Sequence, residues 1–175
     1  MGRARAVVAG LAVVGTLALG GCAGSPQAAA YVGNTQISQA GVDAVSKAIV
    51  EAGAAETTSV ARNVVVQIKI QNEIAKQAAA RANITVTDAQ RQQLLAQNTA
   101  LDPLLKNPET RDFTIDYVNT AVILNNDAGK KAATEVIGDT SVRVNPRYGT
   151  WDPQQLALAE GSSGSLSELA PARQE

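Results

Sequence analysis

The pattern of apolar and polar positions predicts a long helix in the middle of the chain. The helix begins at Thr57 or Thr58, and its apolar residues recur every three or four positions, which places them on one helical face. The stripe contains Val60, Val64, Ile68, Gln71 and Ala75, and it is widened by Val65, Ile74 and Ala78. Asn83 interrupts this pattern.

Shorter helices are predicted on either side of it. Ser38 is a suitable N-cap for a first helix, which Gly53 can end in a left-handed conformation. The apolar positions of this helix are Val42, Val45, Ala48 and Ile49. Residues 87–90, Thr-Asp-Ala-Gln, form a capping box that opens a third helix, whose apolar side consists of Leu94, Leu95 and Ala96.

A fourth helix is predicted after Pro103, which forces a break near Asp102. Asn107 is placed to cap it, and Pro108 suits its first position. Its expected inner face contains Phe113, Tyr117, Val118, Ala121, Val122 and Leu124. The sequence leaves open whether this helix continues past Gly129 as far as Val136, because residues 125–127 and Gly129 are also compatible with a break.

Short strands are predicted at both ends of this helical region. Residues 30–32 and 35–37 flank a Gly-Asn turn. Further along, Val142 and Val144 alternate with the polar Arg143, as in a strand. Pro146 is tolerable only in an edge or kinked strand, and residues 148–151 are expected to resume extended structure. We expect the strand at Tyr31 to pair with the one at Val142, because neither short strand is stable alone. The predicted fold is mainly α, with four or five helices closed by a two-stranded β pairing of the domain's ends.

The N-terminal residues have the layout of a secretory signal. Arg3 and Arg5 precede an uncharged stretch, residues 6–20, that is shorter than the roughly 20 apolar residues of a membrane-spanning helix. Leu19-Gly20-Gly21-Cys22 follows and resembles the lipobox of bacterial lipoproteins, which implies cleavage before Cys22 and acylation of its thiol. We therefore expect a lipid-anchored protein on the extracytoplasmic face of the cell membrane. Cys22 is the single cysteine of the chain, so disulfides are not expected.

Composition then limits the class of partner. Removal of residues 1–21 leaves 154 of the 175 residues, with 13 basic and 16 acidic side chains and a net charge of −3, which disfavours nucleic-acid binding. Aromatic residues make up only 3% of the chain, so the core is expected to be aliphatic. The predicted organisation is a signal peptide at 1–21, a tether at 22–28, a domain at 29–152 and a disordered tail at 153–175.

The two terminal strand regions carry a resemblance. Residues 31–38 (Tyr-Val-Gly-Asn-Thr-Gln-Ile-Ser) and 142–152 (Val-Arg-Val-Asn-Pro-Arg-Tyr-Gly-Thr-Trp-Asp) bracket the helices. This layout resembles the N-terminal chaperone domain of SurA and of PrsA-type foldases, over roughly residues 29–152. The resemblance implies a chaperone domain in which an opening and a closing strand pair around a helical body. Those foldases also carry a parvulin prolyl isomerase domain, for which this chain has neither a histidine nor a long enough stretch.

The chemistry-bearing residues give little support to catalysis. Without histidine, and with the single cysteine assigned to lipid, the usual hydrolase and zinc sites lack a base or ligands. Asp112 and Asp116 lie four apart on the fourth helix and could form a carboxylate pair, but a solvated face is the more common arrangement. Lys130 and Lys131 are interpreted as a favourable contact at a helix end, or as a site for an acidic partner or headgroup. No catalytic residue, cofactor or metal is predicted.

Three aromatic residues are candidates for binding a polypeptide client: Tyr148, Trp151 and Tyr31. The alternative is that they close the domain over its helices. If Tyr148 and Trp151 shared a strand, their odd spacing would place them on opposite faces, so at most one need be core.

The sequence thus leaves three hypotheses for function. The first is a membrane-anchored holdase that binds unfolded secreted proteins without catalysis. The second is an envelope scaffold lipoprotein that binds one folded protein partner. The third is an enzyme that uses carboxylates alone. Unfolded peptides of different sequence would distinguish the first two, since a holdase binds many of them weakly.

Overall fold

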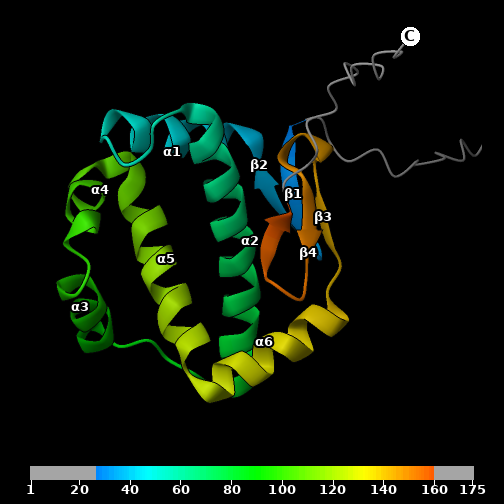
Figure 1. Ribbon diagram of the computed structural model, residues 1–175. Coiled ribbons are helices and arrows are strands. Elements are labelled where there is room, and N and C mark those ends of the chain that lie inside the picture. Colours follow the sequence, from blue (N-terminus) through cyan, green and yellow to red (C-terminus); the bar gives the residue numbers. More distant parts are fainter. Residues whose placement is uncertain (1–26, 160–175) are drawn as a thin grey trace, which may run out of the picture.

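Six α-helices and five short strands are formed by residues 27–159, the part of the chain that the computed structural model describes (Figure 1). The signal peptide, Cys22 and the end of the predicted tail lie outside these residues. In chain order the elements are β1 (Ala28–Val32), β2 (Thr35–Ser38), α1 (Gln39–Glu51), α2 (Thr58–Ala82), α3 (Asp88–Ala96), α4 (Asp102–Lys106), α5 (Pro108–Asn125), α6 (Asp127–Asp139), β3 (Val142–Val144), β4 (Thr150–Asp152) and β5 (Ala157–Ala159). The prediction of a mainly α fold closed by strands is confirmed.

Helix α2 is the centre of the domain, with α1, α5 and α6 packed around it and the strands on one side (Figure 1). The Thr57 hydroxyl accepts a hydrogen bond from the Val60 backbone N–H at 3.3 Å, and Asn83 ends the helix in the left-handed conformation at φ 51°. Both ends lie where the sequence predicted them. Buried positions occur on several faces along its length: Ala61, Val65, Val66, Ile70, Asn72, Ile74, Ala75 and Ala78.

The predicted apolar stripe of α2 is only partly buried. Val60 and Val64 are 54% and 48% exposed, whereas Ala78 is fully buried. Ala78 follows Val60 by 18 residues, which at 3.6 residues per turn is about five full turns, so the two side chains leave the helix in the same direction. The same face is therefore covered near the C-terminal end of α2, where α6 crosses it in Figure 1, and open near the N-terminal end.

The question of the fourth helix is resolved by a break at Asn126. The Asn126 side chain caps α6 by accepting hydrogen bonds from the backbone N–H groups of Ala128 and Gly129, at 2.9 and 3.2 Å. Gly129 lies inside α6 and does not interrupt this helix. A Cβ at this position would lie 2.0 Å from the carbonyl oxygen of Ile123, so the corner between α5 and α6 requires glycine.

Two details of this region differ from expectation. Pro103 lies in the first turn of the short helix α4, so it starts a helix as well as ending the preceding segment. Lys130 lies near the N-terminal end of α6, where the helix dipole does not favour a positive charge; its Nζ atom is 4.0 Å from the Asp127 carboxylate.

The predicted pairing of the two terminal strand regions is confirmed, within a sheet of three strands. The order is β2-β1-β3, all antiparallel, and Tyr31 lies opposite Arg143 while Val32 lies opposite Val142. The third strand, β2, is the expected extended return after the turn at Gly33. Pro146 begins a 3-10 turn (Pro146–Tyr148) between β3 and β4, which removes it from any strand ladder.

The predicted disordered tail begins too early. Residues 153–156 form a turn and β5 pairs with β4, with Trp151 opposite Leu158. Two glutamines of α2 hold this hairpin: the Gln71 side chain donates to the Leu156 carbonyl at 2.7 Å, and the Leu158 backbone N–H donates to Gln67 Oε1 at 3.2 Å. The ordered domain therefore extends to Ala159, seven residues beyond the predicted boundary at residue 152.

Candidate functional site

The three aromatic residues predicted to bind clients occupy different environments. Tyr148 is 4% exposed and belongs to the apolar core, and Trp151 is half-buried against that core. The Trp151 Nε1 atom is buried and has no hydrogen-bond partner among the described residues. Tyr31 is half-buried in β1, and its ring lies 4.9 Å from the Arg143 guanidinium carbon. Tyr148 and Trp151 thus close the domain, as the structural alternative proposed.

An apolar groove lies elsewhere, between the N-terminal half of α2 and the helices α1, α4 and α5, and it contains none of those three aromatic residues. Its volume is about 240 Å³. It is lined by Ile49, Ala54, Val64, Ile68, Leu101, Leu104, Phe113, Thr114 and Tyr117. None of these nine side chains is charged, so the groove offers no carboxylate, amine or imidazole for chemistry.

Local contacts shape the walls of this apolar groove. Gly53, at φ 73°, turns the chain sharply after α1, and the Ala54 backbone N–H donates to the Ile49 carbonyl at 3.0 Å. The Thr110 hydroxyl donates to the Leu104 carbonyl at 2.6 Å, which fixes α4 against the start of α5. Phe113 and Leu104 are each 7% exposed, so their side chains belong to both the groove and the core.

The groove continues along α2 as a row of aliphatic side chains, of which Val60 and Val64 are exposed and Ile68 is half-buried. Val60, Val64 and Ile68 are spaced four residues apart, which brings them close to one another on the helix surface. At 1.5 Å per residue the row is about 12 Å long, the span of roughly four residues of an extended peptide. Val60 and Val64 are the large apolar residues that stand out as exposed within the described part of the chain.

The size of the apolar groove limits what it can hold. A cavity of about 150 Å³ lined by aliphatic and aromatic side chains admits benzene, so 240 Å³ accommodates one large apolar side chain or two small ones. Pockets for drug-sized ligands are larger, about 300–1,000 Å³, and carry several placed polar groups. The geometry therefore favours side chains of a polypeptide over a free small molecule.

One positive side chain, that of Lys69, lies beside this groove. The Lys69 ammonium lies 6.0 Å from the centroid of the Phe113 ring, at the limit for a cation–π contact. The predicted carboxylate pair lies on a neighbouring face of α5: Asp112 is exposed, and Asp116 forms an ion pair with Lys76 at 3.8 Å. Within residues 27–159, no three His, Cys, Asp or Glu side chains are placed to share a metal ion.

Sequence reasoning missed most of the groove. It assigned Val60, Val64 and Ile68 to one apolar stripe and Tyr117 to an inner face, and it gave no role to Leu101 or Leu104. The signal that was available is the group of leucines around Pro103, which have apolar side chains in a segment expected to be a break.

The relation to the membrane depends on residues outside the described region. None of the helices within residues 27–159 is both long and apolar enough to cross a bilayer. Cys22 and the signal peptide precede the first described residue, so lipid attachment stays a prediction from sequence.

The comparisons with known proteins give no assignment. No protein-family model, curated protein or solved structure matches this chain. The resemblance to the SurA and PrsA chaperone domains therefore stays a prediction. The proposal for function rests on the shape and lining of the apolar groove.

Proposed function

We propose that this protein is a lipid-anchored, extracytoplasmic holdase, which binds apolar segments of unfolded secreted polypeptides and performs no catalysis. The observation that carries the proposal is the apolar groove with its continuation along Val60, Val64 and Ile68. Exposed apolar surface of this kind has a cost in water, so its presence on a small domain favours a binding role.

The shape of the groove supports an unfolded client over a single folded partner. A specific interface between folded proteins buries about 800 Å² on each side and uses anchoring polar contacts. The apolar groove and the row along α2 offer a smaller surface than such an interface, and the groove has no charged lining residue that would select one sequence. An extended segment could place two alternate side chains along the row, whatever their identity, provided that they are apolar.

An anchor at Cys22 would make weak binding of clients sufficient. A client emerging at the membrane meets tethered domains at high effective concentration, so each contact can remain brief. The lack of histidine in the chain and of charged side chains in the apolar groove supports binding without bond-making chemistry. The scaffold hypothesis remains the alternative outcome of the test below.

The test uses residues 22–175 with Cys22→Ala, which contain every described residue. This protein should slow the aggregation of several unrelated unfolded clients and leave prolyl isomerisation at its uncatalysed rate. Val64→Asp places a carboxylate in the groove at a position that is half exposed, so the fold should survive while protection falls several-fold. Val64→Leu keeps the apolar surface and should retain protection.

Ala80→Asp is the matched control. Ala80 is exposed on the same helix, beyond the groove, so this change adds the same charge without altering the groove. Equal losses from Val64→Asp and Ala80→Asp would assign the effect to charge and reject the groove as the binding site. Protection of no client, together with tight binding to one folded envelope protein, would replace the holdase by the scaffold.

A further inference from the structure

A second groove lies at the N-terminal ends of α1 and α2, on the side of the strands, and its chemistry is opposite to that of the apolar groove. Its volume is about 180 Å³. It is lined by Gln39, Ser59, Arg62, Asn63, Arg147 and Tyr148. Each of these side chains carries an N–H or O–H donor and none is a carboxylate, so we name it the donor groove.

The charge of the donor groove is positive. Arg62 donates from Nε to the Asp43 carboxylate at 2.6 Å, which orients its guanidinium and leaves the η nitrogens for other acceptors. Arg147 contributes a second guanidinium, and Ser59 lies in the first turn of α2, where the helix dipole is positive. Burial, with a smaller contribution from Asp43, raises the pKa of Tyr148 above its ordinary value, so its phenol stays a donor at neutral pH. Arg62 is paired with Asp43 and Arg147 contacts Tyr148, but each guanidinium has five N–H donors, so both retain donors of the kind that bind phosphate oxygens.

The donor groove also lies where the chain enters the domain. The Gln39 backbone N–H donates to the carbonyl of Gln27, the first described residue, at 2.7 Å. Cys22 is five residues before Gln27, a distance of at most about 17 Å along an extended chain. An acyl chain on Cys22 would therefore hold this end of the domain against the phosphates of the bilayer surface.

We propose that the donor groove binds the phosphodiester of an anionic phospholipid headgroup beside the anchor. The choice of a lipid as the source of phosphate depends on the proposed acylation of Cys22, whereas the chemistry of the groove does not. Residues 22–175 carry 13 basic and 16 acidic side chains, a net charge of −3, so general attraction to an anionic surface does not provide the binding, and a local site is needed.

Headgroup binding would also orient the apolar groove. Around the axis of α2, at 100° per residue, Ser59, Arg62 and Asn63 point on average about 150° away from the row of Val60, Val64 and Ile68. With the donor groove against the bilayer, that row faces away from lipid, toward emerging clients. The two grooves thus have complementary roles on opposite faces of one helix.

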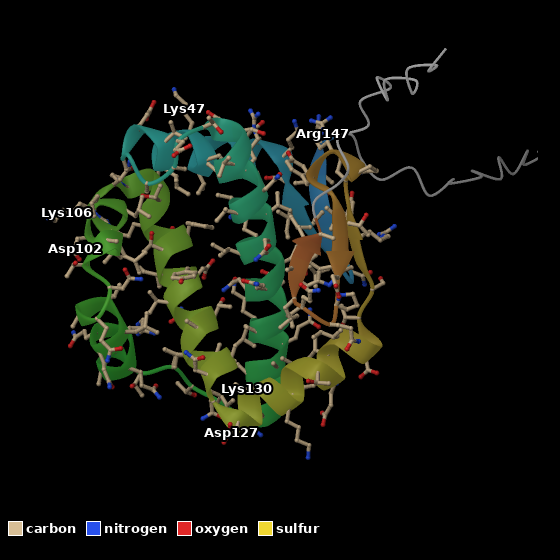
Figure 2. All side chains as sticks on the ribbon, viewed as in Figure 1. Lys47, Asp102, Lys106, Asp127, Lys130 and Arg147 are labelled. Atoms are coloured by element: carbon tan, nitrogen blue, oxygen red, sulfur yellow. The ribbon has the colours of Figure 1, made fainter. Side chains whose placement is uncertain are left out.

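The experiment measures binding of residues 22–175 carrying Cys22→Ala to vesicles of equal parts phosphatidylglycerol and phosphatidylcholine, and to vesicles of phosphatidylcholine alone. Arg147 is exposed, so Arg147→Gln should leave the fold intact and weaken binding to the mixed vesicles about tenfold. Asn63→Asp, which introduces a carboxylate without disturbing the Arg62–Asp43 pair, should give a similar loss. Lys130→Gln removes one positive charge at the opposite end of the molecule and should change binding less than about twofold (Figure 2).

Three results would overturn the proposal. Equal binding to both vesicle types would show that an anionic headgroup is not selected, because phosphatidylcholine carries the same phosphodiester but has no net charge. Equal loss from Arg147→Gln and Lys130→Gln would indicate general electrostatics. Competition by inorganic phosphate at about 1 mM, without lipid selectivity, would assign the groove to free phosphate. Client protection is measured separately, and it should be unchanged in Arg147→Gln, so failure of this proposal is distinguishable from failure of the holdase.

Discussion

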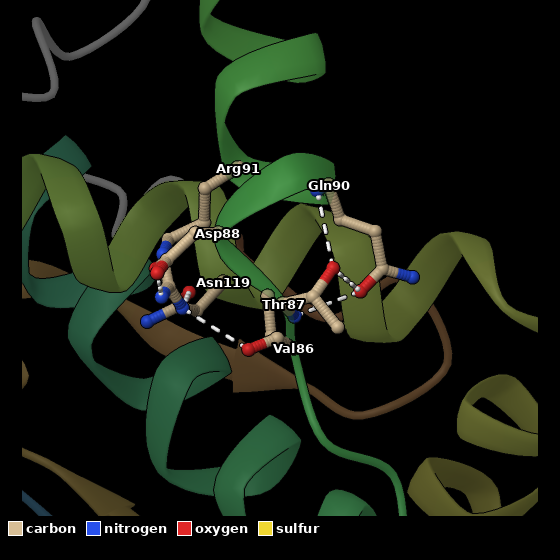
Figure 3. A network of polar contacts seen from close by, with 6 residues as sticks. All are labelled: Val86, Thr87, Asp88, Gln90, Arg91 and Asn119. Atoms are coloured by element: carbon tan, nitrogen blue, oxygen red, sulfur yellow. Dashed lines mark hydrogen bonds and ion pairs between the residues drawn. The ribbon is translucent and has the colours of Figure 1, made fainter.

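Helices α2 and α3 each begin with a threonine N-cap, yet they relate to the core in opposite ways. Eight residues of α2 are buried, whereas no residue of α3 is. In α3, Thr87 and Gln90 form a complete capping box (Figure 3). The Gln90 backbone N–H donates to the Thr87 hydroxyl at 3.3 Å, and the Thr87 backbone N–H donates to the Gln90 side-chain oxygen at 2.9 Å. Capping therefore fixes where a helix begins and says little about what the helix contributes to the stability of the domain.

Polar contacts hold α3 against its neighbours. One η nitrogen of Arg91 donates to the Val86 carbonyl and to Asn119 Oδ1 of α5, each at 3.2 Å, and the other contacts the Asp88 carboxylate (Figure 3). Such half-exposed bonds exchange readily with water and contribute little net free energy. The comparison predicts that α2 unfolds only with the whole domain, while α3 opens locally.

The largest effect should come from the buried face of α2. Ile70 is fully buried, so Ile70→Ala should lower the free energy of unfolding by about 2–5 kcal/mol, measured by urea denaturation. Val64→Ala, on the exposed face of the same helix, should change it by less than about 0.5 kcal/mol. A similar loss from both variants would contradict the assignment of the two faces.

A smaller and local effect is expected in α3. Thr87→Ala removes the N-cap hydroxyl, which is worth about 0.5–2 kcal/mol to the helix. Amide hydrogen exchange across residues 88–96 should accelerate, while the midpoint of thermal unfolding stays close to that of the parent. If the midpoint falls as far as it does in Ile70→Ala, then α3 unfolds together with the core and the contrast between the helices is wrong.

The smallest effect should appear only in alkali. The pKa of Tyr148 is raised above 10.0 by burial and by Asp43, so its phenol loses a proton more easily in the unfolded chain than in the folded one. Stability from this group is complete below pH 10 and is lost as the pH rises through the folded pKa. Between about pH 9 and 11 the parent should lose more stability than Tyr148→Phe, with exchange in α3 unaffected. Parallel stability curves for the two proteins would refute the contribution of Tyr148.

Much of the fold followed from local signals. Ser38, Thr87 and Asn107 were each predicted as caps from their own side chains, and each accepts a hydrogen bond at the start of a helix. Thr57 was one of two residues predicted to start α2, and it caps that helix. The pairing of β1 with β3 followed from two short strands that needed a partner. The hairpin of β4 and β5 could not be predicted in this way. The side chains of Gln67 and Gln71 hydrogen-bond to its backbone, and these residues lie far away in the sequence.

The apolar groove shows where sequence reasoning stopped. The polar residues buried in α5, Thr110, Thr114 and Thr120, donate to nearby backbone carbonyls, so an apolar pattern could not identify them. The donor groove was not predicted either, because its residues come from three separate parts of the chain, at residue 39, residues 59–63 and residues 147–148. Only folding brings them together.

The sequence alone determined where α1, α2, α3 and α5 begin, because capping side chains act on backbone groups a few residues away. It also determined which residues of α2 share a direction. Only the tertiary structure decided which of those residues meet water: Val60 and Ala78 leave the helix on the same side, but Ala78 is fully buried near the end of α2 that α6 crosses, and Val60 is 54% exposed near the other end. Burial depends on what packs against a face, and that partner is set by the path of the whole chain.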